Sequence, residues 1–186
     1  MRTLTDVDWS TIPAPEDDGA AAHLMGSQIP SITLPATDGT NVNLAALTGR
    51  TIIYAYPRTG RPDQPLPEGW DMIPGARGCT PQACTFRDLY KELQDAGANH
   101  VFGLSVQSTE YQKEAAERLH LPFALLSDCE SKLRSELKLP VMLVEVAILL
   151  KRLTMICVDG HIEKVFYPVF PPDRSATDVL DWLQKQ

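Results

Sequence analysis

Residues 78–88 read GCTPQACTFRD and place two cysteines where the sequence predicts the start of a helix. Thr80 followed by Pro81 is typical of an N-cap and a first helical residue. Apolar side chains then recur at helical spacing until Gly97, at Phe86, Leu89, Tyr90 and Leu93. Upstream lie a β-rich run, TIIYAY at 51–56, and a proline-rich loop at 57–81. We therefore expect a buried strand, a long loop and a cysteine-bearing helix.

Strands and helices alternate on both sides of this unit. Before it, residues 32–34 and 42–44 predict a hairpin around Asp38-Gly39. After it we expect strands at 100–106 and 122–126, helices at 109–119, 131–138 and 175–185, and a hairpin at 153–158 and 162–167. A capping box at Thr109 to Gln112 opens the second helix, and the apolar run 139–150 belongs to the core or an interface, with Glu145 in a loop. This order predicts an α/β fold, a mixed central β-sheet with helices on both faces.

Length and composition exclude several classes of protein. The 186 residues suit one domain, and 44% hydrophobic with 22% charged residues argues against a disordered chain. The net charge of −7 argues against a nucleic-acid surface. The longest apolar run falls short of the roughly 20 residues that a membrane span needs. With no visible secretory signal and four cysteines, we expect a cytoplasmic protein with reduced thiols.

The first 27 residues differ from the rest of the chain. They carry five acidic residues against Arg2 alone, together with Pro13, Pro15 and the small-residue run 19–22. This composition predicts an acidic, loosely structured extension at 1–27. The folded domain is expected at 28–186.

The two cysteines of the predicted helix differ in position. Cys79 lies at its start, where free backbone N–H groups, the helix dipole and nearby Arg77 favour the nucleophilic thiolate. Cys84 lies five residues on, about 7.5 Å along the axis and about 140° around it. A disulfide needs Cα atoms within roughly 7 Å, so the pair bridges only if the first turn unwinds.

Residue types alone leave other interpretations of this pair open. Both cysteines could be small buried side chains. A zinc site would need more ligands than the pair supplies, and no histidine lies near it in sequence. The Cys-x-x-Cys spacing of dithiol exchange is absent, and no histidine spacing indicates a cysteine–histidine dyad. Cys157 is expected in the core, and Cys129 in a loop or as an alternative resolving or interchain thiol.

Several motifs together resemble a known family. They are YAYP at 54–57, GCTPQACTFRD at 78–88, LLSD at 125–128 and RLT at 152–154. The sequence over about 28–186 resembles the peroxiredoxins, most of all the peroxiredoxin Q or bacterioferritin comigratory protein branch. The resemblance implies a thioredoxin-like fold with an N-terminal hairpin and an inserted loop before the active-site helix. It also implies a thiol-dependent peroxidase acting on hydrogen peroxide and organic hydroperoxides.

The resemblance assigns roles to individual residues. Cys79 would attack the peroxide and become a sulfenic acid, and Cys84 would resolve it as an intramolecular disulfide. Arg152 would hold the thiolate and polarise the peroxide, Pro57 would shield the thiolate from water, and Thr80 would contact the substrate. A thioredoxin- or glutaredoxin-like protein would reduce the disulfide. The protein is expected to be a monomer or a homodimer. Neither metal nor other cofactor is expected.

Two features depart from the family pattern. In the family pattern the proline stands seven residues before the cysteine, whereas here Pro57 stands 22 residues before Cys79. A 15-residue insertion therefore splits the motif and gives the segment 58–77. Ala76 occupies the position of a Thr or Ser that bonds the thiolate, and Thr59, Thr80 or a backbone donor would have to replace it. The insertion could be a lid or a surface loop packed by Trp70. The missing hydroxyl keeps a peroxide-sensing relay open, and a general thiol–disulfide oxidoreductase is a further alternative that the cysteine spacing disfavours.

Overall fold

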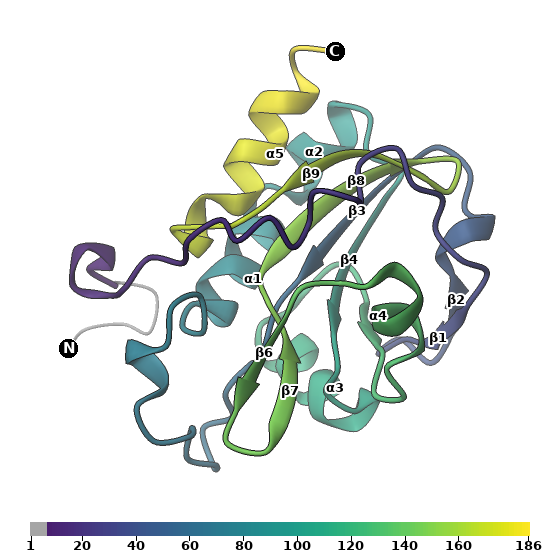
Figure 1. Cartoon of the computed structure of the whole chain (residues 1–186). Coiled ribbons are helices and arrows are strands. Elements are labelled where there is room, and N and C mark those ends of the chain that lie inside the picture. The colour runs from purple at the N-terminus through teal and green to yellow at the C-terminus, as the bar shows by residue number, and fades with distance from the viewer. Residues whose placement is uncertain (1–6) are drawn as a thin grey trace.

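A five-stranded mixed sheet lies at the centre of the computed structural model, which describes residues 7–186 (Figure 1). The strand order is β5 (Leu125–Ser127), β4 (His100–Ser105), β3 (Arg50–Ala55), β8 (Leu153–Val158) and β9 (His161–Phe166). The first three strands run parallel, whereas β8 and β9 pair antiparallel. Every residue of β3 after Arg50 is buried, as the apolar run TIIYA requires of a central strand covered on both faces. The predicted mixed α/β sheet is confirmed.

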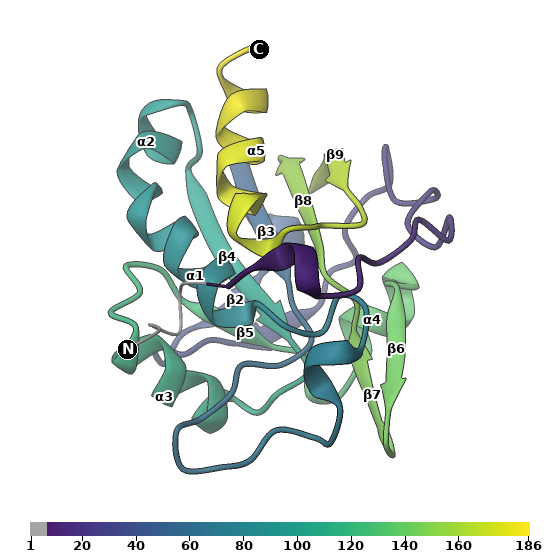
Figure 2. The same cartoon turned by 90° about the vertical axis from the view of Figure 1, so that its left-hand side faces the viewer.

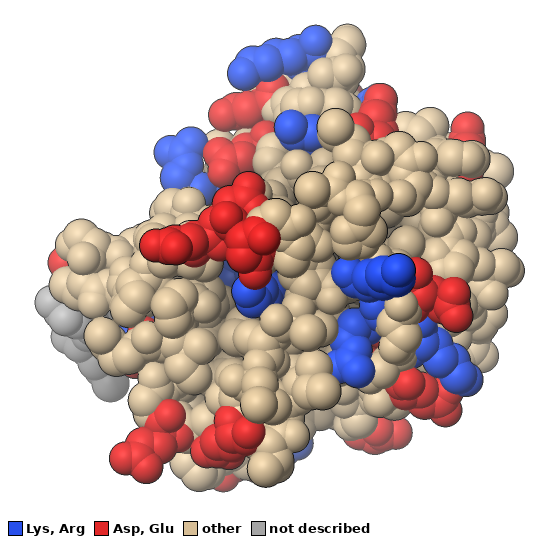
Figure 3. Space-filling view, in the orientation of Figure 1, with Lys and Arg blue, Asp and Glu red and all other residues tan. Residues whose placement is uncertain are grey.

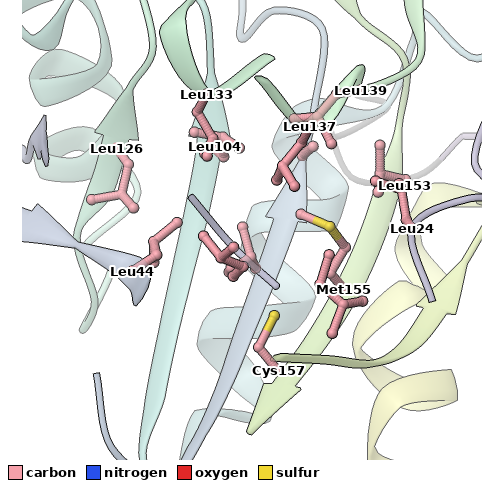
Figure 4. Packing of buried hydrophobic residues seen from close by; sticks show 14 of the residues in the cluster. Leu24, Leu44, Leu104, Leu126, Leu133, Leu137, Leu139, Leu153, Met155 and Cys157 are labelled. Atoms are coloured by element: carbon pink, nitrogen blue, oxygen red, sulfur yellow. The ribbon is translucent and has the colours of Figure 1, made fainter. Parts of the chain in front are cut away.

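Helices cover both faces of this sheet. On one face Ile52, Tyr54 and Ile156 pack against α1 (Cys79–Asp88), α2 (Tyr90–Asp95) and α5 (Ser175–Leu183). On the other face, side chains of β3, β4 and β8 that point away from these helices pack against α4 (Lys132–Leu137). Figure 4 shows Leu104 of β4 and Met155 of β8 in this cluster with Leu133 and Leu137 of α4. The hairpin of β1 (Thr33–Pro35) and β2 (Asn41–Asn43) also packs there, while α3 (Thr109–Arg118) lies against β5. Short 3₁₀ turns complete the chain at Trp9–Thr11, Leu44–Ala46, Trp70–Met72 and Pro172–Arg174.

Helix boundaries differ from the sequence-based expectation. Cys79 is the first residue of α1 and Gly78 its N-cap, with φ of 110°, so Thr80 is not the cap. The single predicted helix also breaks at Leu89 into α1 and α2. The N-cap of α3 is Ser108, whose side chain accepts the Tyr111 N–H, and no capping box forms at Thr109. Ser108 caps α3 through a local contact, whereas Gly78 at the start of α1 packs closely against Trp9 and Pro172, which are distant in sequence.

The apolar run 139–150 forms a hairpin that the sequence did not reveal. Strands β6 (Val141–Val144) and β7 (Ala147–Leu150) pair antiparallel, and Glu145 turns the chain with φ of 54°. Val144, Leu149 and Leu150 are buried, whereas Leu143 and Val146 are 71% and 97% exposed. The expected core position is therefore confirmed for the buried side chains of this hairpin. For its exposed side chains, an interface stays a prediction. The strand expected at 122–126 is shifted and forms β5 at Leu125–Ser127.

The segment 7–27 packs on the domain, so the expected loose structure is wrong for these residues. Leu24 is fully buried in the core. Trp9 donates its indole N–H to Asp173, and Asp18 binds Lys151 and the Tyr167 hydroxyl. Figure 1 shows this segment, in purple, crossing the molecule close to β8 and β9. Residues 1–6 of the predicted extension lie outside the described residues, and the domain boundary at residue 28 stays a prediction.

Charged side chains of both signs lie on the face shown in Figure 3, around a broad area without charge, and Lys and Arg form no continuous basic surface on this face. Among residues 7–186, no helix is long and apolar enough to span a membrane.

Candidate active site

Cys79 meets a buried arginine where α1 begins. Arg152 lies between β7 and β8, is 2% exposed, and donates from Nη2 to the Cys79 Sγ at 3.2 Å. Cys79 itself is 4% exposed. Arg152 therefore places a fixed cation in hydrogen-bond contact with the buried sulfur.

A set of backbone carbonyls and one amide fixes the orientation of Arg152. The carbonyls of Gly75, Ala76 and Arg77 accept from Nη2 at 3.3, 3.1 and 3.3 Å. Nη1 donates to the amide oxygen of Gln82, and this amide in turn donates to Ser175 Oγ at 3.2 Å. Sequence reasoning missed Gln82, although its spacing of three residues from Cys79 places both on the same side of α1. The network connects Gln82 of α1, Arg152 just before β8, and Ser175 of α5.

The position of the missing hydroxyl contributes a backbone group instead. Ala76 is fully buried, and its carbonyl lies 3.7 Å from the Cys79 Sγ, so the thiol form donates to it. The Thr59 hydroxyl donates to the Gln107 side chain at 3.1 Å and is therefore not the replacement. Arg77 pairs with Asp71 at 2.7 Å rather than with the sulfur. Arg152 is thus the cation that contacts Cys79.

A pocket of about 460 Å³ opens over Cys79. Thr80 and Pro81 of α1 line its inner side, and the insertion supplies most of its outer wall. The insertion is anchored by Trp70, which packs with Ala76, Val144 and Leu149. In Figure 2 this segment lies below α1 and beside the β6–β7 hairpin. The insertion therefore both lines the pocket and packs on the domain through Trp70. Pro57 is buried after β3 and is not among the pocket-lining residues.

Comparison with known proteins agrees with this geometry. The Redoxin family model matches residues 24–180. Peroxiredoxin Q of the chloroplast from Gentiana triflora is 31% identical over 94% of this chain and 76% of its own length. The corresponding protein of Sedum lineare is 34% identical over 86% of this chain and 77% of its own. The chain belongs to the peroxiredoxins, within the redoxin family.

Solved structures show the same fold at lower identity. Peroxidoxin BcpB from Mycobacterium tuberculosis superposes with a TM-score of 0.69, at 24% identity, over 87% of this chain and 96% of its own. Peroxiredoxin Q from Xanthomonas campestris gives 0.67, at 22% identity, over 86% and 96%. This peroxiredoxin therefore has the thioredoxin-like fold expected from its motifs and is a thiol-dependent peroxidase, which takes a peroxide as substrate and a thiol as reductant.

The second cysteine of this peroxiredoxin lies in the same helix. Cys84 is buried on α1, and both thiols are free. Burial is the largest cause that raises the pKa of the Cys84 thiol, with Arg87 opposing and Asp88 adding to it. Cys84 is therefore held as a neutral thiol, and α1 separates it from Cys79 by more than a helical turn. The roles of Cys79, Cys84, Arg152, Pro57 and Thr80 stay predictions.

The two remaining cysteines occupy different surroundings. Cys157 is buried in β8, and burial raises its pKa to about 12. Cys129 is exposed after β5. Within residues 7–186, no three His, Cys, Asp or Glu side chains gather as metal ligands. The expectation of no metal or cofactor stays a prediction.

Proposed function

We propose that the Cys79 thiolate is the group that attacks the peroxide. Sulfur attacks the terminal oxygen of ROOH, the O–O bond breaks, and the leaving RO⁻ takes a proton and departs as ROH. Cys79 becomes a sulfenic acid and the peroxide is reduced by two electrons. The contact of Arg152 Nη2 with Cys79 Sγ carries this proposal, because the same guanidinium can stabilise the charge that moves onto the oxygens.

Cys84 resolves the sulfenic acid after α1 opens. Its sulfur attacks the Cys79 sulfur, an S–S bond forms, and the hydroxyl leaves as water with the thiol proton. The two sulfurs meet only when the first turn of α1 unwinds, since the intact helix holds them apart. A thioredoxin- or glutaredoxin-like dithiol then takes over the disulfide and returns both thiols.

The cellular setting follows from this cycle. A disulfide that forms in every turnover needs reductant at hand, which supports a cytoplasmic location. We propose that the protein is a monomer or a homodimer. Cell fractionation and sedimentation of the reduced protein test these two points.

Peroxide consumption with a dithiol recycling system tests the catalytic assignment. We expect Cys79→Ser to abolish turnover and Cys84→Ser to stop after one peroxide in the absence of an external thiol. Mass spectrometry after one equivalent of peroxide should find a Cys79–Cys84 bridge in the wild type. Full activity of Cys79→Ser would overturn the assignment, and absence of the bridge would indicate a one-cysteine mechanism.

A peroxide-sensing relay is the second candidate, and Ala76 favours it. Without a hydroxyl at this position, one donor to the reacting oxygens is missing, which predicts slower peroxide reduction. A relay would show slow turnover, complete Cys79 oxidation and a trapped mixed disulfide with another protein. Fast turnover without such a disulfide excludes the relay.

A further inference from the structure

The pocket over Cys79 is much larger than hydrogen peroxide. Its volume is about 460 Å³, whereas a water molecule occupies about 30 Å³ and hydrogen peroxide roughly twice that. Pockets of this size hold organic molecules. Leu66, Trp70 and Pro62 give the wall an apolar surface, and they all belong to the insertion. The insertion therefore builds a space for a carbon skeleton beside the reacting sulfur.

The charges of the pocket do not cancel. Four arginines line it, and three of them have carboxylate partners. Arg61 pairs with Asp63 through two hydrogen bonds, Arg77 with Asp71, and Arg118 with Glu114.

Arg58 is the fourth arginine, and it has no anionic partner among residues 7–186. Its guanidinium lies 5.8 Å from the centroid of the Tyr111 ring, and its Nε is buried without a hydrogen-bond partner. Arg61 lies 5.5 Å from the centroid of the same ring, so Tyr111 contacts both an arginine with a carboxylate partner and one without. A half-buried cation without a counter-ion attracts an anion from solvent or ligand.

We propose that Arg58 receives the carboxylate of an acidic organic hydroperoxide, with the carbon skeleton against Leu66 and Trp70 and the hydroperoxide at Cys79. This assignment rests on the proposed function of Cys79 and adds the substrate class. Arg58 is a specificity-determining residue that acts on binding, while bond breaking stays with Cys79 and Arg152.

Two substrates with the same cumyl hydroperoxide skeleton and different charge test the assignment. Cumene hydroperoxide is neutral, whereas its derivative with a carboxylate in the para position of the ring is an anion. The second-order rate constant for Cys79 oxidation is measured for each by stopped-flow tryptophan fluorescence. We expect the wild type to prefer the carboxylate about tenfold, the gain typical of a charge-assisted hydrogen bond. Arg58→Gln should abolish the preference, and Arg58→Lys should retain part of it.

Arg61→Gln is the matched control, because it removes the same charge from the same wall while Arg61 already has Asp63 as partner. The preference should survive in this variant. No preference in the wild type, survival in Arg58→Gln, or equal loss in both Gln variants overturns the assignment. Failure of the proposed function looks different, because the wild type would then show no Cys79 oxidation with either substrate.

Discussion

Arg152 is a buried guanidinium that has no carboxylate partner among residues 7–186. Its neutral acceptors, three carbonyls and the Gln82 amide, orient it but leave its charge uncompensated. An unpaired buried cation is costly, so Arg152 is placed to stabilise the negative charge that develops at the reacting atoms beside the Cys79 sulfur.

Arg152→Lys should slow the oxidation of Cys79 by about 10²-fold or more. An ammonium cannot contact the sulfur and the Gln82 amide together, and losing one charge-stabilising donor typically costs this much. Stopped-flow measurement with hydrogen peroxide checks the rate, and thermal unfolding checks that the variant is folded. Arg77→Lys is the control, since Arg77 pairs with Asp71 and is expected to stay within about twofold. Equal effects of the two variants would contradict the assigned contact.

Cys157 should make the protein less stable at alkaline pH. Its folded-state pKa is about 12, raised mainly by burial and further by Glu163, while an unfolded thiol has about 8.5. The neutral thiol is favoured in the folded state, so its contribution is complete below about pH 8.5 and is lost as pH rises toward 12. Between pH 7 and 10 the wild type should lose about 2 kcal/mol more than Cys157→Ala.

Urea unfolding at the two pH values measures this difference. Cys129→Ala is the control, because Cys129 is exposed, and its pH dependence should match the wild type. If Cys157→Ala lost as much stability as the wild type, the buried thiol would not be the source.

At the scale of elements, α1 begins where only glycine fits well. Gly78 has φ of 110°, and a Cβ there would lie 2.6 Å from Pro172 Cγ and 2.8 Å from Trp9 Cη2. The 3₁₀ turn Pro172–Arg174 and the N-terminal segment therefore press directly on the residue before Cys79. The first turn of α1 is held by contacts from both ends of the chain.

Gly78→Ala should destabilise the reduced protein by about 1–3 kcal/mol, from left-handed strain and crowding. The disulfide form should lose less, because there the first turn is already unwound. Thermal unfolding of both forms measures the two losses. Gly69→Ala is a suitable control, since Gly69 also has positive φ, at 70°, but no atom lies within 4 Å of its added Cβ. Equal losses in the two redox forms would show that the turn stays intact in the disulfide.

Elements with a clear periodicity could be predicted, and their ends could not. The apolar runs at β3 and β8 and the Asp-Gly turns set strands and hairpins locally. The N-cap at Gly78 depends on Trp9 and Pro172, which are distant in sequence, whereas the N-cap at Ser108 is local and lies one residue before the expected one. The β6–β7 run lacks polar–apolar alternation because its exposed positions also carry apolar side chains, at Val141, Leu143 and Ile148. In the site, motif residues were predictable, whereas Gln82 and the Ala76 carbonyl act through the packing of α1 on β8.

At the scale of the molecule, the N-terminal segment connects surface and site. Its acidic composition predicts looseness, yet Asp18 binds Lys151 and Tyr167, and these hydrogen bonds hold the pKa of the Asp18 carboxyl well below its usual range. This carboxylate stabilises the folded state above its ordinary pKa and loses that effect as pH falls. Further toward the N-terminus, Trp9 packs edge-on against Phe170 and Val7 lines the pocket over Cys79.

Trp9→Ala should therefore speed disulfide formation several-fold after Cys79 is oxidised. The indole N–H donates to Asp173 at 2.7 Å and the ring covers Gly78, so its removal frees the first turn of α1 to unwind. The reduced protein should also lose about 1–2 kcal/mol, since a half-buried ring is removed. Quenched-flow sampling with mass spectrometry follows the sulfenic acid and the Cys79–Cys84 bridge. Asp18→Asn releases the same segment far from α1 and should leave the bridging rate unchanged, so equal acceleration in both variants would attribute the effect to general loosening rather than to the contact of Trp9 with the start of α1.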